Sequence, residues 1–340
     1  MGRMATTLNM QLNSKLKKKL GFKPNVQRFS EWVIGAFVLL TFCDVAFVLS
    51  TTESSRLIEQ GNNCLHEQNP DAAVHKFDQS VMVAPFSGRA HLYRAIAYSR
   101  LKQFDRAADD LAAASKLGVP QDLILLSQAS EQCASGDYTA AMMSAQSLLQ
   151  KGNTDPHVLL VLGTCQSRLG LTADALKNLS TAIESSNSLE LRANAFYERA
   201  LIEHKQHDKG ALADIRKSLE LNPSPGAYLL QADILQSTKR FKEAVNDYSY
   251  LLASEPNNAV ILTARGVCYA RLKDRGHAIA DFTHAVQLDQ NCLESYIQRG
   301  NVYFEAGRYK EAVSDFQIAQ KLSPALSEVS TKLQIAQSKL

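Results

Sequence analysis

From residue 291 to residue 324 the chain reads NCLESYIQRGNVYFEAGRYKEAVSDFQIAQKLSP. Two small residues in this stretch, Gly300 and Ala312, stand twelve positions apart. Small residues at matched places let two helix backbones approach closely, while Tyr303 and Phe316 fill the space around them. The stretch therefore predicts a pair of packed helices with a proline in the turn that ends it.

The same pattern recurs along the preceding residues at intervals of 33 to 36 residues. The small position of the second helix is taken by Ala73, Ala107, Ala141, Ala175, Ala211, Ala244, Ala278 and Ala312. The small position of the first helix is taken by Gly61, Ala95, Ala129, Gly163, Ala200, Ala232, Gly266 and Gly300. Eight matched pairs of small residues predict eight repeats.

A column of mostly large apolar residues follows the second small position by four residues. It consists of Phe77, Leu111, Ala145, Leu179, Ile215, Tyr248, Phe282 and Phe316. The turns between repeats carry a proline at one fixed offset at Pro85, Pro223, Pro256 and Pro324. Ala145 leaves the column thin, so we expect the third repeat to pack least tightly.

Spacing, residue types and turn chemistry together resemble the tetratricopeptide repeat family, and its positions in the last repeat are filled by Gly300, Tyr303, Gly307, Tyr309, Ala312, Phe316, Ala319 and Pro324. The resemblance implies an all-α fold, a right-handed α-solenoid superhelix of eight helix pairs. The repeats would cover residues 54–324, at about 54–87, 88–121, 122–155, 156–189, 190–223, 224–257, 258–291 and 292–324. Apolar residues near helical spacing predict a capping helix over residues 325–340.

The N-terminal residues predict a membrane anchor before the repeats. Residues 1–31 are rich in Lys and Arg, and residues 32–50 are apolar except for Asp44 and are long enough for a helix to span a bilayer. The residues assigned to this anchor are Trp32, Phe37, Leu40, Asp44 and Phe47. The basic arm would stay in the cytoplasm, which places the repeats on the far side, in a periplasm or a lumen.

Several features of the N-terminal region allow two interpretations. The basic arm is either an amphipathic helix at an anionic membrane surface or a disordered tail. Asp44 is either a polar contact to a partner helix or a tolerated residue in a segment that still inserts. The apolar segment is either a retained anchor or a signal that is cleaved near Ser50.

Composition limits the function classes. The chain has 340 residues, 45% of them hydrophobic, and a formal net charge of +3, as in an ordinary globular protein. Because the basic excess lies in residues 1–31, the repeats themselves are slightly acidic, which argues against a nucleic-acid partner.

No catalytic motif stands out, and we expect neither an enzyme nor a small-molecule substrate. The six cysteines lack the paired short spacing of metal sites, so no metal or other cofactor is expected. His204, His207 and Asp208 are better explained as a polar turn than as metal ligands. Cys133 and Cys165 fall on the first helices of successive repeats, but the pattern favours free thiols over a disulfide.

The resemblance also implies a concave groove lined by the first helices, and its groove positions map onto Arg89, Leu92, Ile96, Arg100, Leu160, Thr164, Arg168, Arg271, Ile297, Asn301 and Phe304. Arg100, Arg168 and Arg271 share one repeat position, which would suit an acidic segment. The family's two-carboxylate clamp for chaperone tails needs lysine and asparagine at set places. Asn301 matches it, but its companion is Ile297, so a clamp-type adaptor is not expected.

The sequence thus predicts a membrane-anchored scaffold that binds proteins or extended peptide segments in its groove and supports the assembly of a larger complex. Two alternatives remain open. One is a cleaved, exported chaperone or assembly factor, and the other is a receptor on an organelle membrane with its repeats in the cytosol. The predicted partners are other proteins and, through residues 32–50, the lipid bilayer.

Overall fold

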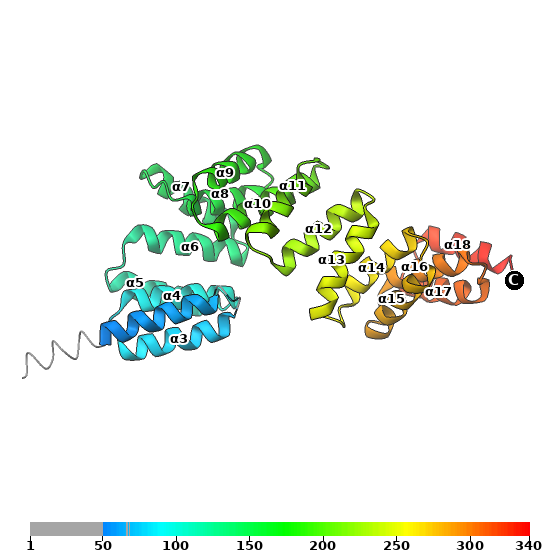
Figure 1. Ribbon diagram of the computed structural model, residues 1–340, viewed down its shortest axis with the longest axis horizontal. Helices are drawn as coiled ribbons and strands as arrows, with labels where there is room; N and C mark the ends of the chain where they lie inside the picture. The colour runs from blue at the N-terminus through cyan, green and yellow to red at the C-terminus, as the bar shows by residue number, and fades with distance from the viewer. Residues whose placement is uncertain (1–49, 66, 68) are drawn as a thin grey trace, which may run out of the picture. The chain divides into compact units, whose positions relative to one another are not determined.

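The structure, a computed structural model, describes residues 50–65, 67 and 69–340. Within these ranges helices are the only regular elements. The chain divides into two compact units, an N-terminal unit that ends at Ser127 and a C-terminal unit that begins at Gln128. The predicted all-α repeat architecture is confirmed for the described residues (Figure 1).

The N-terminal unit is a stack of helices. Its described part starts with helical residues 50–65 and continues with α3 (Pro70–Val83), α4 (Gly88–Arg100), α5 (Phe104–Lys116) and the first half of α6 (Gln121–Ser135). Helix α4 packs against both α3 and α5. The core of this unit lies between these helices, around Phe77 and Leu111.

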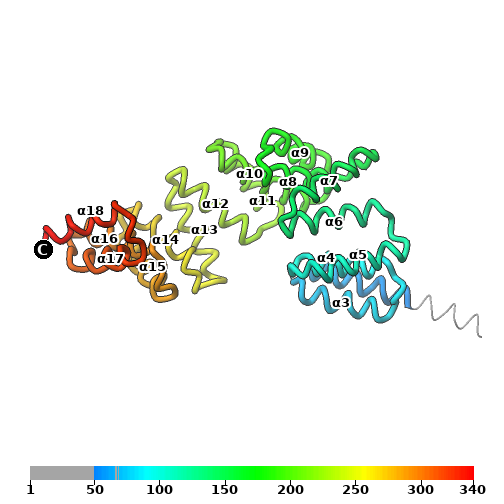
Figure 2. The backbone as a smooth tube through the Cα atoms, turned by 180° about the vertical axis from the view of Figure 1, so that it is seen from behind, coloured from blue at the N-terminus to red at the C-terminus, as the bar shows by residue number. Residues whose placement is uncertain are grey.

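The C-terminal unit begins with the second half of α6. Its further helices are α7 (Tyr138–Gln150), α8 (Pro156–Arg168), α9 (Thr172–Ser185), α10 (Leu189–Lys205), α11 (Ala211–Leu221), α12 (Pro225–Ser237), α13 (Phe241–Ser254), α14 (Ala259–Arg271), α15 (Arg275–Leu288), α16 (Leu293–Glu305), α17 (Tyr309–Leu322) and α18 (Ser327–Gln337). Helices α14 to α17 form two successive hairpins, and α18 closes against α17 (Figure 2).

Local sequence signals begin and end these helices. The side chains of Asn69, Asp155 and Ser224 cap α3, α8 and α12, and each is followed by a proline at the first helical position. From the pair of α4 and α5 onward, the turn inside each pair carries one residue with positive φ, seven places after the small residue of the first helix. These residues are Lys102, Gly136, Gly170, His207, Lys239, Lys273 and Gly307.

The small residues of the first helices face the column of large apolar residues on the second helices, as the sequence predicts. A Cβ added to Gly266 would lie 2.7 Å from the ring of Phe282, and one added to Gly300 would lie 2.8 Å from the ring of Phe316. Both rings are fully buried. The close approach of the two helices of a pair therefore depends on the absence of a side chain at these glycines.

The predicted transmembrane helix over residues 32–50 lies outside the described residues except for Ser50, and so do the basic arm and the anchor residues Trp32, Phe37, Leu40, Asp44 and Phe47. In the part that is described, no helix has both the length and the apolar character needed to cross a membrane. Helices α3 to α18 run from 11 to 17 residues, whereas a span needs about 20. The predicted single-pass localisation, with a cytoplasmic N-terminus and an array on the far side, conflicts with this finding and is corrected accordingly.

Candidate functional site

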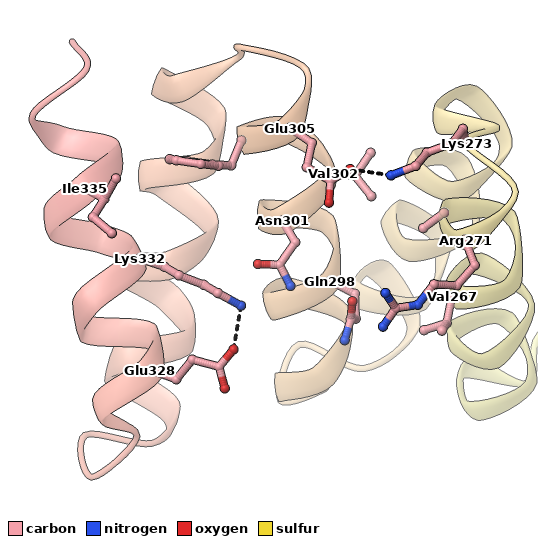
Figure 3. A pocket seen from close by; sticks show the side chains of 12 residues that line it. Val267, Arg271, Lys273, Gln298, Asn301, Val302, Glu305, Glu328, Lys332 and Ile335 are labelled. Atoms are coloured by element: carbon pink, nitrogen blue, oxygen red, sulfur yellow. Dashed lines mark hydrogen bonds and ion pairs between the residues drawn. The ribbon is translucent and has the colours of Figure 1, made fainter. Parts of the chain in front are cut away.

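A hollow of about 770 Å³ lies between α14, α16 and α18 in the C-terminal unit (Figure 3). Helices α14 and α16 are the first helices of successive pairs, so the hollow lies on the face where such helices are neighbours. Its apolar lining consists of Val267, Ala270, Val302, Phe304 and Ile335. Its polar lining consists of Arg271, Lys273, Gln298, Asn301, Glu305, Glu328 and Lys332.

The charges around this hollow are not all neutralised. Lys273 pairs with Glu305 at 3.3 Å, and Lys332 pairs with Glu328 at 2.6 Å. Arg271 is exposed and forms no ion pair with any residue that the structure describes. The hollow thus offers one uncompensated guanidinium to an incoming ligand.

The polar groups that could orient a ligand converge with this guanidinium. Gln298 and Asn301 extend from α16 into the space that Arg271 enters from α14 (Figure 3). Phe304, one turn beyond Asn301, packs edge-on against Tyr309 with ring centroids 5.5 Å apart. An aromatic surface therefore stands beside two amides and a cation, which suits an extended chain with an acidic group.

Three of the residues predicted from the sequence meet in this hollow: Arg271, Asn301 and Phe304. Ile297 lies on α16 with Asn301 and Phe304, but it is half-buried and packs against the apolar cluster around Phe316. Glu328, Lys332 and Ile335 were not predicted from the sequence, because α18 follows the last repeat and has no equivalent earlier in the chain.

The predicted residues of the second repeat lie in the N-terminal unit. Arg89 and Leu92 line a separate hollow of about 460 Å³ between the start of α4 and the turn at Val119. Leu92 is buried in the core, whereas Ile96 is half-buried and Arg100 is exposed.

The predicted residues of the fourth repeat are largely engaged with neighbours. Leu160 is buried in a core cluster, and Thr164 is half-buried. Arg168 pairs with Glu198 of α10 at 3.1 Å. Burial raises the pKa of Glu198, and the Arg168 charge opposes that rise. Arg168 is thus a partner of a buried carboxylate, which distinguishes it from Arg271.

A set of arginine–aspartate pairs was not recognised in the sequence. In four repeats an arginine directly before the small residue of the first helix binds an aspartate of the second helix. The pairs are Arg94–Asp110, Arg199–Asp214, Arg265–Asp281 and Arg299–Asp315. Each arginine also reaches the second helix of the preceding repeat, at Asp78, Ser180, Ser249 and Thr283. Each arginine therefore connects two neighbouring repeats through polar contacts. The arginine and the aspartate recur at fixed repeat positions, and this recurrence could have predicted the pairs from the sequence.

Comparison with known proteins agrees with the repeat geometry. Family models described as tetratricopeptide repeat match residues 59–118, 259–292 and 293–326. These matches support the resemblance to tetratricopeptide repeats in those stretches. The same helix-pair pattern continues through the residues between them.

Similar proteins include two human relatives. Tetratricopeptide repeat protein 13 of Homo sapiens is 29% identical over 159 residues, which cover 45% of this chain and 18% of that protein. DnaJ homolog subfamily C member 7 of Homo sapiens is 27% identical over 191 residues, which cover 54% of this chain and 33% of that protein. The chain therefore spans a third or less of the length of these relatives.

A solved structure shows the same fold. YrrB, described as a TPR protein with an unusual peptide-binding site, superposes with a TM-score of 0.50 at 16% identity. The match covers 57% of this chain and 97% of YrrB.

Proposed function

We propose that this chain is a protein-binding scaffold that holds an extended acidic peptide segment of a partner protein between α14, α16 and α18. The observation that carries the proposal is the hollow in which Arg271 stands without an ion-pair partner among the described residues. The proposal is one of binding without catalysis, and it places no metal or other cofactor in the hollow.

The lining favours an extended segment over a small molecule. Phe304 and Ile335 offer apolar area to side chains of the segment. The amide of Asn301, and that of Gln298, which already donates one N–H to Glu294, can pair with peptide groups. Apolar surface flanked by a few orienting polar groups is typical of ligand sites.

The charge distribution favours an acidic segment. Lys273 and Lys332 already have carboxylate partners, so they add little net attraction. Arg271 presents five donors and has no ion-pair partner among the residues that the structure describes. A basic segment would meet Arg271 as a like charge. A bidentate contact to an aspartate or glutamate would satisfy the guanidinium.

Fluorescence polarisation with the full chain tests the proposal. Labelled extended peptides that share an apolar residue and differ only in an adjacent glutamate, glutamine or lysine serve as probes. We expect the glutamate peptide to bind most tightly, and Arg271→Ala to weaken it by about tenfold, the loss of roughly one charged hydrogen-bond pair. Phe304→Ala should weaken the glutamate and glutamine peptides alike.

Arg216→Ala is the matched control, since it removes the same charge from a half-exposed arginine on α11 that pairs with Glu243. It should leave binding unchanged. Equal binding of the three peptides, or an equal loss in Arg271→Ala and Arg216→Ala, would reject the proposed site.

A further inference from the structure

Two cysteine thiols on successive first helices of the C-terminal unit lie close enough to shift one another's pKa. Cys133 stands near the end of α6, and Cys165 lies within α8. Cys165 is completely buried, whereas Cys133 is half-buried. The binding function proposed above does not use either of them.

The contact follows from the geometry of the repeat. Cys133 stands four residues after the small Ala129, and Cys165 stands two residues after the small Gly163 of the next repeat. Gln236 and Cys268 occupy the same two places in a later pair of repeats, and their side chains meet at 3.5 Å. The register of the array therefore brings these two positions together, and at one pair of repeats both are cysteine.

The surroundings give the two thiols different roles. The hydrogen bond from Cys165 lowers the pKa of Cys133, and the nearby Arg168 acts in the same direction while Glu198 opposes it. The same hydrogen bond and burial raise the pKa of Cys165. The less buried of the two cysteines is thus the one whose thiolate is stabilised, as an attacking cysteine requires.

We propose that Cys133 and Cys165 are a reversible dithiol–disulfide site, in which Cys133 attacks a low-molecular-weight disulfide and Cys165 resolves the adduct. In the first step the Cys133 thiolate bonds to one sulfur of glutathione disulfide, and the other glutathione leaves as a thiolate. In the second step Cys165 loses its proton and bonds to the Cys133 sulfur, and the second glutathione leaves. The protein loses two electrons and two protons, and both electrons reduce glutathione disulfide to two thiols.

The bond would tie α6 to α8 and so fix the third repeat to the fourth. Closing the intervening chain into a loop limits the unfolded state. Oxidation is therefore expected to stabilise the part of the array whose apolar column is thinnest, at Ala145.

The test is titration of the full chain with mixtures of glutathione disulfide and glutathione, followed by acid quenching, thiol counting and peptide mapping by mass spectrometry. We expect two thiols to be lost and a Cys133–Cys165 link to form, with both thiols restored by dithiothreitol. In Cys165→Ala, which keeps a small apolar residue in the core, the reaction should stop at glutathione on Cys133. In Cys133→Ser, Cys165 should remain a thiol.

Cys292→Ser is the matched control, because Cys292 is also half-buried and is hydrogen-bonded to Ser295. The Cys133–Cys165 link should form in this variant to the same extent as in the parent chain. The proposal fails if the parent chain retains glutathione on Cys133, if Cys133 links to another cysteine, or if Cys165 reacts in Cys133→Ser. Circular dichroism of each variant before oxidation confirms that the comparison is made between folded chains.

Discussion

At the scale of single residues, Gly300 separates the effect of close packing from the effect of helix propensity. Alanine is preferred to glycine inside a helix by about 1 kcal/mol, so propensity alone predicts that Gly300→Ala stabilises the chain. The added Cβ would lie 2.8 Å from the fully buried ring of Phe316. We expect this overlap to win, with a net loss of about 1–3 kcal/mol in the free energy of unfolding measured with urea.

Gly276→Ala is the control for this prediction, because Gly276 also lies in a helix but an added Cβ would have its nearest neighbour at 3.9 Å. It should be neutral or slightly stabilising. If both variants shift the unfolding midpoint in the same direction, the close approach at Gly300 does not control packing.

Arg299 tests how much an arginine–aspartate pair between neighbouring repeats contributes to stability. It donates to both carboxylate oxygens of Asp315, which is 3% exposed, and to Thr283 of the preceding repeat. Arg299→Met should cost about 3–5 kcal/mol in urea unfolding, because it leaves a buried carboxylate without a counter-charge. Adding Asp315→Leu to this variant should recover most of the loss.

The exposed pair Arg308–Glu311 provides the comparison. Arg308→Met should change stability by less than about 1 kcal/mol, since exposed ion pairs contribute little. An equal loss at Arg299 and Arg308, or no recovery in the double variant, would show that burial of Asp315 does not determine the cost.

These residues also show what a sequence can reveal. The small and large apolar columns were predictable because packing needs those residue types in every repeat. The arginine–aspartate pairs were not predicted, since a charged residue on a helix is usually solvated and only four repeats carry both partners. Of the groove residues, Arg271 and Arg168 share a repeat position. Only the structure shows that Arg168 forms an ion pair with Glu198, whereas Arg271 forms none with a described residue.

At the scale of elements, the hairpin of α10 and α11 holds the Glu203 carboxyl group in surroundings that disfavour its charge. Burial raises the pKa of Glu203 to about 7, with Asp214 and Asp208 acting in the same direction and Arg199 opposing them. One oxygen of Glu203 is buried without a hydrogen-bond partner. The group therefore binds a proton more tightly in the folded chain than in the unfolded chain.

The sign of the pH effect follows. The stability that protonated Glu203 contributes is fully present below the unfolded pKa near 4.5 and is lost as the pH rises through about 7. Between pH 5 and pH 8 the parent chain should lose on the order of 1 kcal/mol more in unfolding free energy than Glu203→Gln, a value reduced by partial solvation.

Glu220→Gln on α11 serves as the reference, because Glu220 is fully exposed and its hydrogen bond to Lys217 lowers its pKa. This variant should follow the parent chain across the same pH range. An unchanged slope in Glu203→Gln would show that Glu203 is ionised in the folded chain throughout.

Helix α18 illustrates a limit of prediction at this scale. Its existence was predictable from the apolar spacing after Pro324, and Val329 and Leu333 do pack onto the last pair. The contribution of α18 to the hollow could not be predicted, because this helix lies outside the repeat register. Glu328 and Lys332 could be placed opposite Arg271 only once the packing of α18 was known.

At the scale of the whole molecule, the array should not be equally stable along its length. In repeat arrays each pair contacts only its neighbours, so a weak pair can open locally. The boundary between the two compact units falls within α6, in the third repeat, where the sequence predicts the loosest packing. Helix α7 buries only Ala141, Ala145 and Leu148.

Hydrogen exchange of the full chain measures this difference. We expect the slowest amides of α7 to exchange at least about tenfold faster than those of α15, where Phe282 fills the place of Ala145, because each 1.4 kcal/mol of opening free energy changes the rate tenfold. Phe282→Ala recreates the thin column in the seventh repeat and should bring the amides of α15 toward the rates of α7 while leaving α9 unchanged. Equal protection of α7 and α15 in the parent chain, or a uniform loss along the array in the variant, would mean that the apolar column does not determine where the chain opens.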